Sequence, residues 1–256
     1  MVNAILGRLA IYSFSKIFVI VTFVVVINPT SNSPYSLRSF GTMPAKSDSS
    51  QLPKNWPSNL PYLTTTLHSK ILTPTHISFL RTRTEDAREI PPNTPKGPCQ
   101  LVKITPISTP SHPANGQSGL FATKDLKPGT FILQYLGEIH ATSARPASTS
   151  LVDPHANSDY DLSLDRELGL GIDADKRGNE ARFINDYRGI AEKPNAEFKE
   201  IWDERRKERG MGVWVLNEGK SGKGKGIRKG EEILVSYGRG FWGARKGEDN
   251  GAVNGG

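Results

Sequence analysis

The 256-residue sequence has one cysteine, Cys99. A single thiol excludes an intramolecular disulfide framework, and it also excludes a zinc module built from a cluster of cysteines. The sequence has no GxGxxG motif after an apolar run, no GxxxxGK[ST] motif and no HExxH motif. The usual signatures of dinucleotide-binding proteins, P-loop nucleotide hydrolases and zinc proteases are therefore absent. The five histidines are scattered without the spacing of metal ligands, so no metal site is expected.

Long amphipathic helices are also missing, and the chain is instead rich in turn-forming residues. It contains 18 prolines and 25 glycines, which argues against a helical bundle. The formal net charge is +7, which permits binding to an acidic partner but does not demonstrate it. The composition is that of a domain of ordinary size with irregular appendages.

The N-terminus has no acidic residue before Asp48. Residues 17–27 form an apolar run broken only by Thr22, with Arg8 and Lys16 before it. This pattern is typical of a secretory signal or a signal anchor, although the run is short for a membrane-spanning helix. Alternatively, residues 1–42 are an extension of the gene model and translation starts near Met43. The first interpretation predicts a secretory or membrane-associated protein, and the second a nuclear or cytoplasmic one.

Composition divides the rest of the chain into three parts. Residues 43–100 are rich in Pro, Ser and Thr, which predicts an irregular N-terminal extension with only a weak helix signal at 60–72. Residues 101–238 are predicted to form a mostly β domain, and residues 239–256 a C-terminal tail.

Short apolar runs separated by turn residues carry the β prediction. Residues 101–107 alternate like a strand, and 116–140 show two apolar runs separated by Lys-Pro-Gly. Further strands are expected around 160–164, 169–174, 195–202, 213–218 and 231–238, with a Gly-Lys turn region at 220–231. Residues 197–210 have the charge spacing of a helix, with a charged loop as the alternative.

Six segments follow one another in an order that resembles the SET domain of protein lysine methyltransferases. They are GQSGLFATKDLKPG (116–129), YLGE (135–138), SDYDLSLD (158–165), GNEARFINDY (178–187), PNAEF (194–198) and KGEEILVSYG (229–238). The resemblance implies a mostly β fold of short twisted sheets with a knot-like threading of the C-terminal segment. It also implies S-adenosylmethionine as cofactor and protein lysine N-methylation as the reaction. The cysteine-rich zinc segments that flank many SET domains are not present.

The resemblance assigns cofactor contacts to the turn before the second strand, to the RFIN segment and to the C-terminal aromatics. The positions are Gln117, Ser118, Gly119, Leu120, Phe121, Arg182, Phe183, Asn185, Asp186, Tyr237 and Trp242. Three of them need comment. Gln117 stands where the family has a glycine, Asp186 replaces a histidine, and Trp242 is expected either to cover the cofactor or channel or to pack on the domain edge.

The same resemblance assigns the catalytic roles to Tyr237 and Tyr160. Tyr237 would hold its hydroxyl beside the amine and the methyl group, and Tyr160 would line the lysine channel. Val235 stands where relatives place an aromatic residue, which predicts a roomier channel and methylation beyond one methyl group.

The sequence gives only limited information about the substrate. Residues 153–175 contain seven acidic residues and one basic residue, Arg166. Such a stretch would attract a basic segment such as a histone tail, although a solvated loop is the alternative. The basic stretch at 205–229 lacks interleaved aromatics, so direct nucleic-acid binding is not expected.

Three hypotheses remain open from the sequence. The first is an S-adenosylmethionine-dependent protein lysine methyltransferase. The second is a catalytically weak or inactive SET-fold protein that binds a peptide or chromatin partner, motivated by Asp186 and Val235. The third is a membrane-tethered protein, motivated only by residues 17–27.

Overall fold

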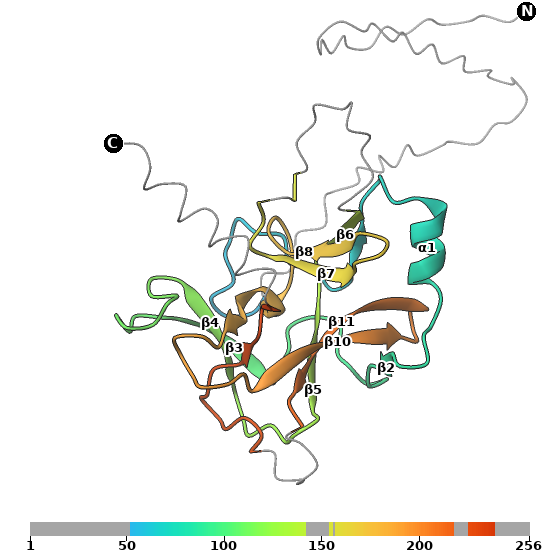
Figure 1. The fold of residues 1–256 in the computed structure, drawn as a ribbon. Helices are drawn as coiled ribbons and strands as arrows, with labels where there is room; N and C mark the ends of the chain where they lie inside the picture. Colours follow the sequence, from blue (N-terminus) through green and yellow to red (C-terminus); the bar gives the residue numbers. More distant parts are fainter. Residues whose placement is uncertain (1–51, 142–153, 156, 218–224, 239–256) are drawn as a thin grey trace, which may run out of the picture. The chain divides into compact units, whose positions relative to one another are not determined.

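The computed structural model describes residues 52–141, 154–155, 157–217 and 225–238 (Figure 1). These residues all lie within one compact unit that starts at Asp48. The apolar run at 17–27 and the tail at 239–256 lie outside the described residues. Among the described residues, every helix is too short or too polar to cross a bilayer.

Short strands make up most of the regular structure, so the predicted mostly β fold is confirmed. One α-helix and one 3-10 helix, η2, are the helical elements among the described residues. The elements are β1 (Leu67–His68), α1 (Pro74–Leu80), β2 (Arg88–Glu89), β3 (Val102–Pro106), β4 (Ser118–Ala122), β5 (Phe131–Tyr135), β6 (Glu138–Ala141), β7 (Asp161–Asp165), β8 (Leu170–Asp173), η2 (Glu180–Phe183), β9 (Asn185–Asp186), β10 (Ala196–Asp203), β11 (Glu208–Val215) and β12 (Leu234–Val235).

The strands form two four-stranded sheets and two strand pairs. One sheet has the order β1-β6-β8-β7, and the other has the order β2-β10-β11-β5. The pairs are β3 with β4 and β9 with β12. Strand β7 is an edge of the first sheet, while β1 and β2 each close an edge by parallel pairing with β6 and β10.

The lysine- and glutamate-rich stretch at 197–210 is not a helix, so the helix interpretation is wrong. It forms the β10–β11 hairpin, with antiparallel register from Ala196 opposite Val215 to Asp203 opposite Glu208. Lys207 closes the turn with φ of 52°, a conformation that a helix does not use. Burial decides the outcome, because every residue of β11 is buried and a helix would expose half of them.

The two apolar runs around Lys-Pro-Gly are strands β4 and β5, but they do not pair with each other. Gly129 takes φ of +73° in the turn between them, which suits glycine. Strand β4 pairs with β3, and Leu120 O accepts a hydrogen bond from Ile233 N at 2.7 Å. Strand β5 pairs with β11 instead. The turn therefore connects two strands that belong to different sheets.

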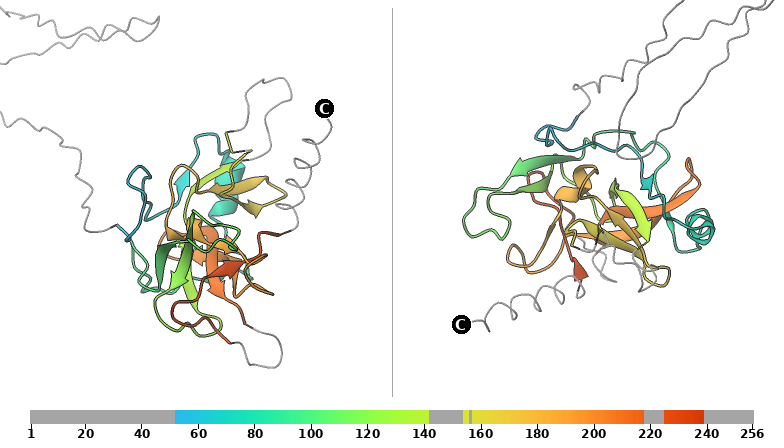
Figure 2. Two further views of the ribbon diagram at one scale, coloured as in Figure 1. Left: turned by 90° about the vertical axis from the view of Figure 1, so that its left-hand side faces the viewer. Right: turned by 90° about the horizontal axis from the view of Figure 1, so that it is seen from above.

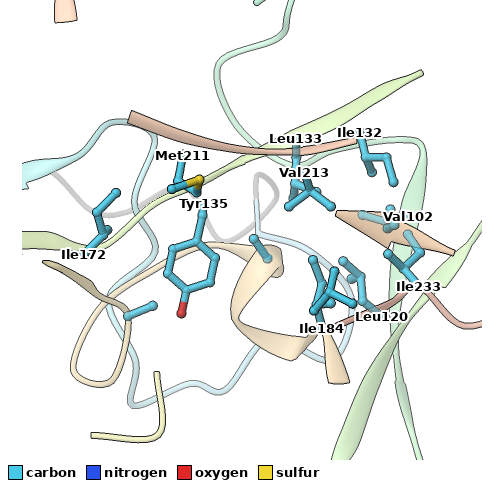
Figure 3. Packing of buried hydrophobic residues seen from close by; sticks show 14 of the residues in the cluster. Val102, Leu120, Ile132, Leu133, Tyr135, Ile172, Ile184, Met211, Val213 and Ile233 are labelled. Carbon is cyan, nitrogen blue, oxygen red and sulfur yellow. The ribbon is translucent and has the colours of Figure 1, made fainter. Parts of the chain in front are cut away.

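The main hydrophobic cluster joins these layers (Figure 3), and a smaller cluster contains Ile90, Phe131, Ile201 and Trp214. Leu120 and Ile172 are completely buried, and Val213 is too. They come from β4, β8 and β11, which belong to three different strand groups. Because one cluster draws on all of them, the sheets depend on each other for burial of their apolar faces.

Residues 52–100 are mostly irregular, as expected, but they pack against the rest of the domain. Trp56, Leu80 and Ile90 are all buried. The weak helix signal at 60–72 is wrong, and the helix is α1, which begins at Pro74 after the N-cap Thr73. Proline in the first turn and a capping threonine are ordinary start signals that the sequence interpretation missed. Helix α1 lies beside the β10–β11 hairpin (Figure 1).

A buried carboxylate ties this N-terminal segment to η2. Glu180, which begins η2, is 2% exposed. Its two oxygens accept hydrogen bonds from the Tyr62 hydroxyl at 2.9 Å and from Cys99 N at 2.7 Å. Burial raises the pKa of this carboxyl group, while the hydrogen bonds lower it by smaller amounts. Residues 52–100 thus contribute directly to the position of η2.

The C-terminal strand returns to the middle of the domain. Strand β12 pairs in parallel with β9, with Leu234 opposite Asn185 and Val235 opposite Asp186. Hairpin β3–β4 lies next to η2, as both views in Figure 2 show. These contacts gather the segments around 118, 185 and 235 in one region, although they are far apart in the sequence.

Candidate active site

A pocket of about 460 Å³ opens between β7, η2 and the residues after β12. Both predicted catalytic residues, Tyr160 and Tyr237, line it. Arg182 also lines it, but Asn185 and Val235 do not. The full lining is Tyr135, Asp159, Tyr160, Asp161, Leu162, Ser163, Leu164, Arg166, Ala181, Arg182, Ile184, Phe198, Tyr237 and Gly238.

Tyr237 is held at both its backbone and its side chain. Its hydroxyl donates a hydrogen bond to Ile184 O at 2.6 Å, and its backbone N donates to Asp186 Oδ2 at 2.8 Å. Burial raises the pKa of the Tyr237 hydroxyl, and the nearby Asp186 and Tyr160 raise it further. The hydroxyl is therefore neutral at physiological pH and can position a group but cannot act as a base.

Asp186 acts as a structural anchor for this part of the site. It is buried, and besides Tyr237 N it accepts hydrogen bonds from the backbone and the guanidinium of Arg188. The Asp186–Arg188 distance of 2.9 Å makes this a close ion pair. The predicted cofactor contact of Asp186 stays a prediction, and the contacts described here explain why an acid is tolerated at this position.

The Tyr160 ring is held in place by the guanidinium group of Arg182. The guanidinium carbon of Arg182 lies 4.0 Å from the centre of the Tyr160 ring, within the range of a cation–π contact. Arg182 is in turn held by a hydrogen bond from its Nε to Ala174 O at 2.9 Å. In this structure Arg182 therefore orients Tyr160, while its predicted contact with the cofactor stays a prediction.

Tyr135 completes the pocket, and the sequence analysis did not select it. It lies in β5, is 5% exposed, and donates its hydroxyl to Tyr160 O at 2.6 Å. Its ring packs edge-on against Phe198 with centroids 5.6 Å apart. Burial raises the pKa of Tyr135, so its hydroxyl also remains a neutral donor. The YLGE motif contains Tyr135, but its role emerges only from the contact with Tyr160.

Steric contact with a neighbouring strand explains the glycine of the same motif, Gly137. A Cβ on Gly137 would clash with the backbone carbonyl of Asp173 on the neighbouring strand β8. Glycine therefore permits the close approach of the chain at the start of β6 to the end of β8.

A second group of polar residues lies at the start of β4. Asn185 Nδ2 donates to Glu232 Oε1 at 2.7 Å and approaches Ser118 O at 3.5 Å. The His112 ring N lies 3.0 Å from Glu232 Oε2. Because Ala114 N donates to His112 Nδ1, the proton of the neutral ring sits on Nε2 and points at Glu232. Ser118 and Asn185, which the sequence analysis assigned to the cofactor, are therefore neighbours.

Glycine at position 119 makes room for this group. A Cβ on Gly119 would clash with the Glu232 carboxylate. Glu232 thus lies against the Ser118–Gly119 backbone with its side chain 8% exposed. The sequence analysis missed both Glu232 and His112, because a Gly-Glu-Glu sequence after a lysine-rich turn is usually a solvent-exposed turn.

The remaining predicted contacts are placed as follows. Gln117 is exposed, and the Leu120 side chain is completely buried in the core. Phe121 is half-buried and opposite Glu232 in a β-bridge. Phe183 packs edge-on against Trp56 with centroids 5.8 Å apart. Trp242 lies outside the described residues, so its predicted role stays a prediction.

Val235 does not lie where the sequence analysis expected it. Its side chain is completely buried in the core, and it is not part of the pocket lining. The prediction that valine widens the end of a lysine channel therefore loses its geometric basis. A tyrosine at this position would overfill the core rather than the pocket.

The acidic stretch is used largely for internal contacts. Asp161 is 2.9 Å from His140, and Asp173 accepts hydrogen bonds from Ser158 and pairs with His155 at 2.6 Å. Of the predicted acidic lip, Asp159 and Asp161 line the pocket and Glu167 is exposed. Asp153 lies outside the described residues.

The cofactor that the sequence pattern implies is consistent with this chemistry. A carboxylate and an amide meet at the Ser118–Gly119 backbone, which suits a ligand that carries a positive charge and polar groups. A Cβ at Gly116 would meet no atom within 4 Å, so the turn is open at that point. Ser118, Asn185 and Glu232 are the residues that would hold S-adenosylmethionine.

Comparison with known proteins identifies the central part of the chain. Residues 117–238 match the family model described as SET domain. Similar solved structures include an active polycomb repressive complex 2 in the stimulated state, 24% identical over 48% of this chain and 14% of that chain, with a TM-score of 0.34. Another is ctPRC2 in an autoinhibited conformation bound to S-adenosylmethionine, 24% identical over 57% and 17%, with a TM-score of 0.38.

A third similar structure is the Chaetomium thermophilum polycomb repressive complex 2, 22% identical over 55% of this chain and 16% of that chain, with a TM-score of 0.39. This chain spans only a small part of the length of those chains, and with TM-scores below 0.5 they add no argument to the family model. The family model covers the strands and turns that carry Tyr160, Asn185 and Tyr237. Residues 117–238 of this chain therefore form a SET domain.

Proposed function

We propose that this chain is an S-adenosylmethionine-dependent protein lysine N-methyltransferase. The supporting observation is the pocket in which the Tyr237 hydroxyl is held on Ile184 O and the Tyr160 ring lies beneath Arg182. The Tyr237 hydroxyl and the Tyr160 ring, both held in place, form walls that suit a lysine side chain. The SET-domain match over the same residues supports this reaction class.

The reaction needs alignment more than a strong base. A lysine amine has a pKa of about 10.4, so it is protonated in water and must lose a proton before it attacks. A partly apolar pocket lowers that pKa by desolvation, and the proton can leave to water. When bound, S-adenosylmethionine supplies an electrophilic methyl group on a sulfonium. Tyr237, Tyr160 and the Ile184 carbonyl would hold the lysine amine in line with that methyl group.

Tyr237 contributes position rather than proton transfer. Its O–H is directed at Ile184 O, so the lone pairs of its oxygen remain available to accept a hydrogen bond from the lysine amine. The Ile184 carbonyl lies beside it, where weak CH···O contacts with a polarised methyl group can form. Holding nitrogen and carbon in line in this way is the main source of rate in such a transfer.

The substrate is proposed to be a basic protein segment, with a histone tail as the first candidate. Strand β7 is the edge of its sheet and carries Asp161, and Asp159 lies just before it. An extended segment can add to such an edge through backbone hydrogen bonds, while these two carboxylates favour lysine and arginine.

Calorimetry and a methyl-transfer assay test the proposal together. S-adenosylmethionine is expected to bind, and radiolabelled methyl groups are expected to appear on histones or on proteins of a cell lysate. Acid-stable label on lysine is the expected product. Absence of cofactor binding by the folded protein would contradict the assignment.

A second candidate is a SET-fold protein that binds a peptide but transfers methyl groups weakly or not at all. One observation favours it: the Asn185 amide is engaged by Glu232 and Asp186 is engaged by Arg188, so both predicted cofactor side chains have internal partners. Peptide binding that is independent of S-adenosylmethionine, with no transfer to any protein, would distinguish this candidate from the enzyme.

Replacement of Asn185 by alanine tests the cofactor region. Asn185→Ala is expected to weaken S-adenosylmethionine binding by about 1–3 kcal/mol, because it removes a polar contact and leaves the Glu232 carboxylate with fewer donors. Calorimetry measures the change. Asn93→Ala, an exposed asparagine in the N-terminal segment, is the control and is expected to leave affinity unchanged. Equal affinities for all three proteins would remove Asn185 from the site.

A further inference from the structure

A second pocket lies apart from the Tyr237 pocket. It has a volume of about 420 Å³ and shares no lining residue with the first pocket. Its walls come from residues 63–65, the Pro-rich loop at 90–101, strand β5 and the turn between β10 and β11. Its volume lies within the range of ~300–1,000 Å³ that is typical of clefts for small organic ligands.

The floor of this pocket is apolar. Ile90 and Phe131 lie on it, together with Leu133 from the same strand as Phe131. Each of these side chains is buried with 8% exposure or less. An apolar floor favours a ligand with an apolar body, because the ligand gains the free energy of removing that surface from water.

The rim carries an excess of positive charge. Among its lining residues are Lys96, Lys124, Arg205 and Arg206, against a single carboxylate, Asp203. Asp203 is 4% exposed and already accepts hydrogen bonds from the backbone N–H groups of the turn. Asp203 also lies 3.6 Å from Arg205, and the buried Glu208 pairs with Arg206, so the net positive charge of the rim comes mainly from Lys96 and Lys124.

The two arginines are held in place without a ligand. Arg205 donates to Thr94 O at 2.9 Å across the mouth of the pocket, and Arg206 donates to the buried Glu208 at 2.9 Å. Fixed arginines lose little conformational freedom when they bind, which favours affinity. Lys96 and Lys124 are exposed and can move to meet a charge.

We propose that this pocket binds a small organic anion, one with an apolar body and a carboxylate, sulfonate or phosphate group. The apolar body would lie against Ile90, Phe131 and Leu133, and the anionic group would face Lys96 and Lys124. A nucleic acid would need a longer basic surface with aromatic platforms, which this concave pocket does not offer. The inference does not depend on methyltransferase activity.

Anilinonaphthalene sulfonate is a suitable probe, because it joins two aromatic ring systems, a phenyl and a naphthalene, to a single anionic group. Phenylnaphthylamine has similar rings without the sulfonate and is the matched neutral probe. In the full chain, the sulfonate is expected to bind with saturable fluorescence and about tenfold more tightly than the neutral probe. The double variant Lys96→Glu and Lys124→Glu is expected to lose that preference.

The single cysteine provides an independent measure of where the probe binds. Cys99 lines this pocket, and no other cysteine exists in the chain. Burial raises the pKa of its thiol to about 11, so alkylation with iodoacetamide must be followed at alkaline pH. Saturating probe is expected to slow the alkylation of Cys99 several-fold, as followed by intact mass.

Lys103→Glu is the control for a general loss of positive charge. Lys103 is exposed on β3 and lines neither pocket described above. It is expected to leave both the fluorescence and the protection of Cys99 unchanged, with equal melting temperatures confirming that all variants fold. The proposal is overturned if Cys99 reacts at the same rate with and without saturating probe, or if Lys103→Glu weakens binding as much as the double variant.

Discussion

A chain that begins at Leu101 is expected to fail to fold, whereas a chain that begins at Met43 is expected to fold. The shorter chain loses Trp56, Leu80 and Ile90, which are buried in the domain. Deletion of a large buried side chain costs about 2–5 kcal/mol, and a domain is stable by only about 5–15 kcal/mol. Three such losses together are enough to remove cooperative folding.

The same truncation also removes contacts that hold η2, which lines the candidate active site. It removes the Tyr62 hydroxyl and Cys99 N, which hold the buried Glu180 at the start of η2. It also uncovers the edges of β6 and β10 by deleting β1 and β2. The cut at Met43, in contrast, leaves the unit that starts at Asp48 complete.

Circular dichroism during heating measures this difference. The chain from Met43 is expected to show a cooperative transition, and the chain from Leu101 is expected to show none. A cooperative transition at the same temperature in both chains would show that residues 52–100 are dispensable, in spite of their burial.

The strands of the domain were predictable because their signals are local. Alternation at 101–107 and the short apolar runs at 160–164 and 169–174 correspond to β3, β7 and β8. Pairing was not predictable in the same way. Strands β4 and β5 flank a Lys-Pro-Gly turn that is typical of a hairpin, but β4 pairs with the preceding strand β3 and β5 pairs with the distant β11.

Elements of two residues carry no recognisable pattern. Strands β1 and β2 each consist of two residues, and their existence depends on the neighbouring edges of β6 and β10. For the same reason the Pro-rich segment was taken for an extension outside the core. Tertiary packing, not local propensity, decides the structure of this segment.

The site was predictable where a motif fixed the residue, and not where the contact was long-range. Tyr160 and Tyr237 meet in one pocket, as their positions in the motifs implied. Glu232 and His112 were not foreseen, because their carboxylate–imidazole contact joins residues 120 positions apart. Buried polar groups need such partners, but a single sequence does not show which partner is used.

Replacement of Tyr237 by phenylalanine is expected to reduce methyl transfer by about 10²-fold or more while the fold is kept. The variant loses only the hydroxyl, whose hydrogen bond to Ile184 O contributes on the order of 1 kcal/mol to stability. The backbone contact of Tyr237 N with Asp186 is unaffected, so the ring stays in place. What is lost is the fixed oxygen that we propose orients the amine in the transition state, and groups of this kind are worth about 10²–10³ in rate.

Single-turnover measurements with saturating S-adenosylmethionine test this expectation, since they separate the transfer step from cofactor binding. The Tyr237 pKa is raised by burial, so wild-type turnover is expected to show no decline that reports ionisation of this residue at mildly alkaline pH.

Tyr62→Phe is the matched control: it removes another half-buried hydroxyl, bonded to Glu180, that is not part of the pocket lining. Turnover at the wild-type rate in Tyr237→Phe would make Tyr237 a packing residue. The Tyr62 hydroxyl bonds to Glu180 in η2, and the Tyr237 hydroxyl bonds to Ile184, the residue that follows η2. An equal loss of turnover in Tyr62→Phe would therefore show that the effect comes from a general disturbance of η2.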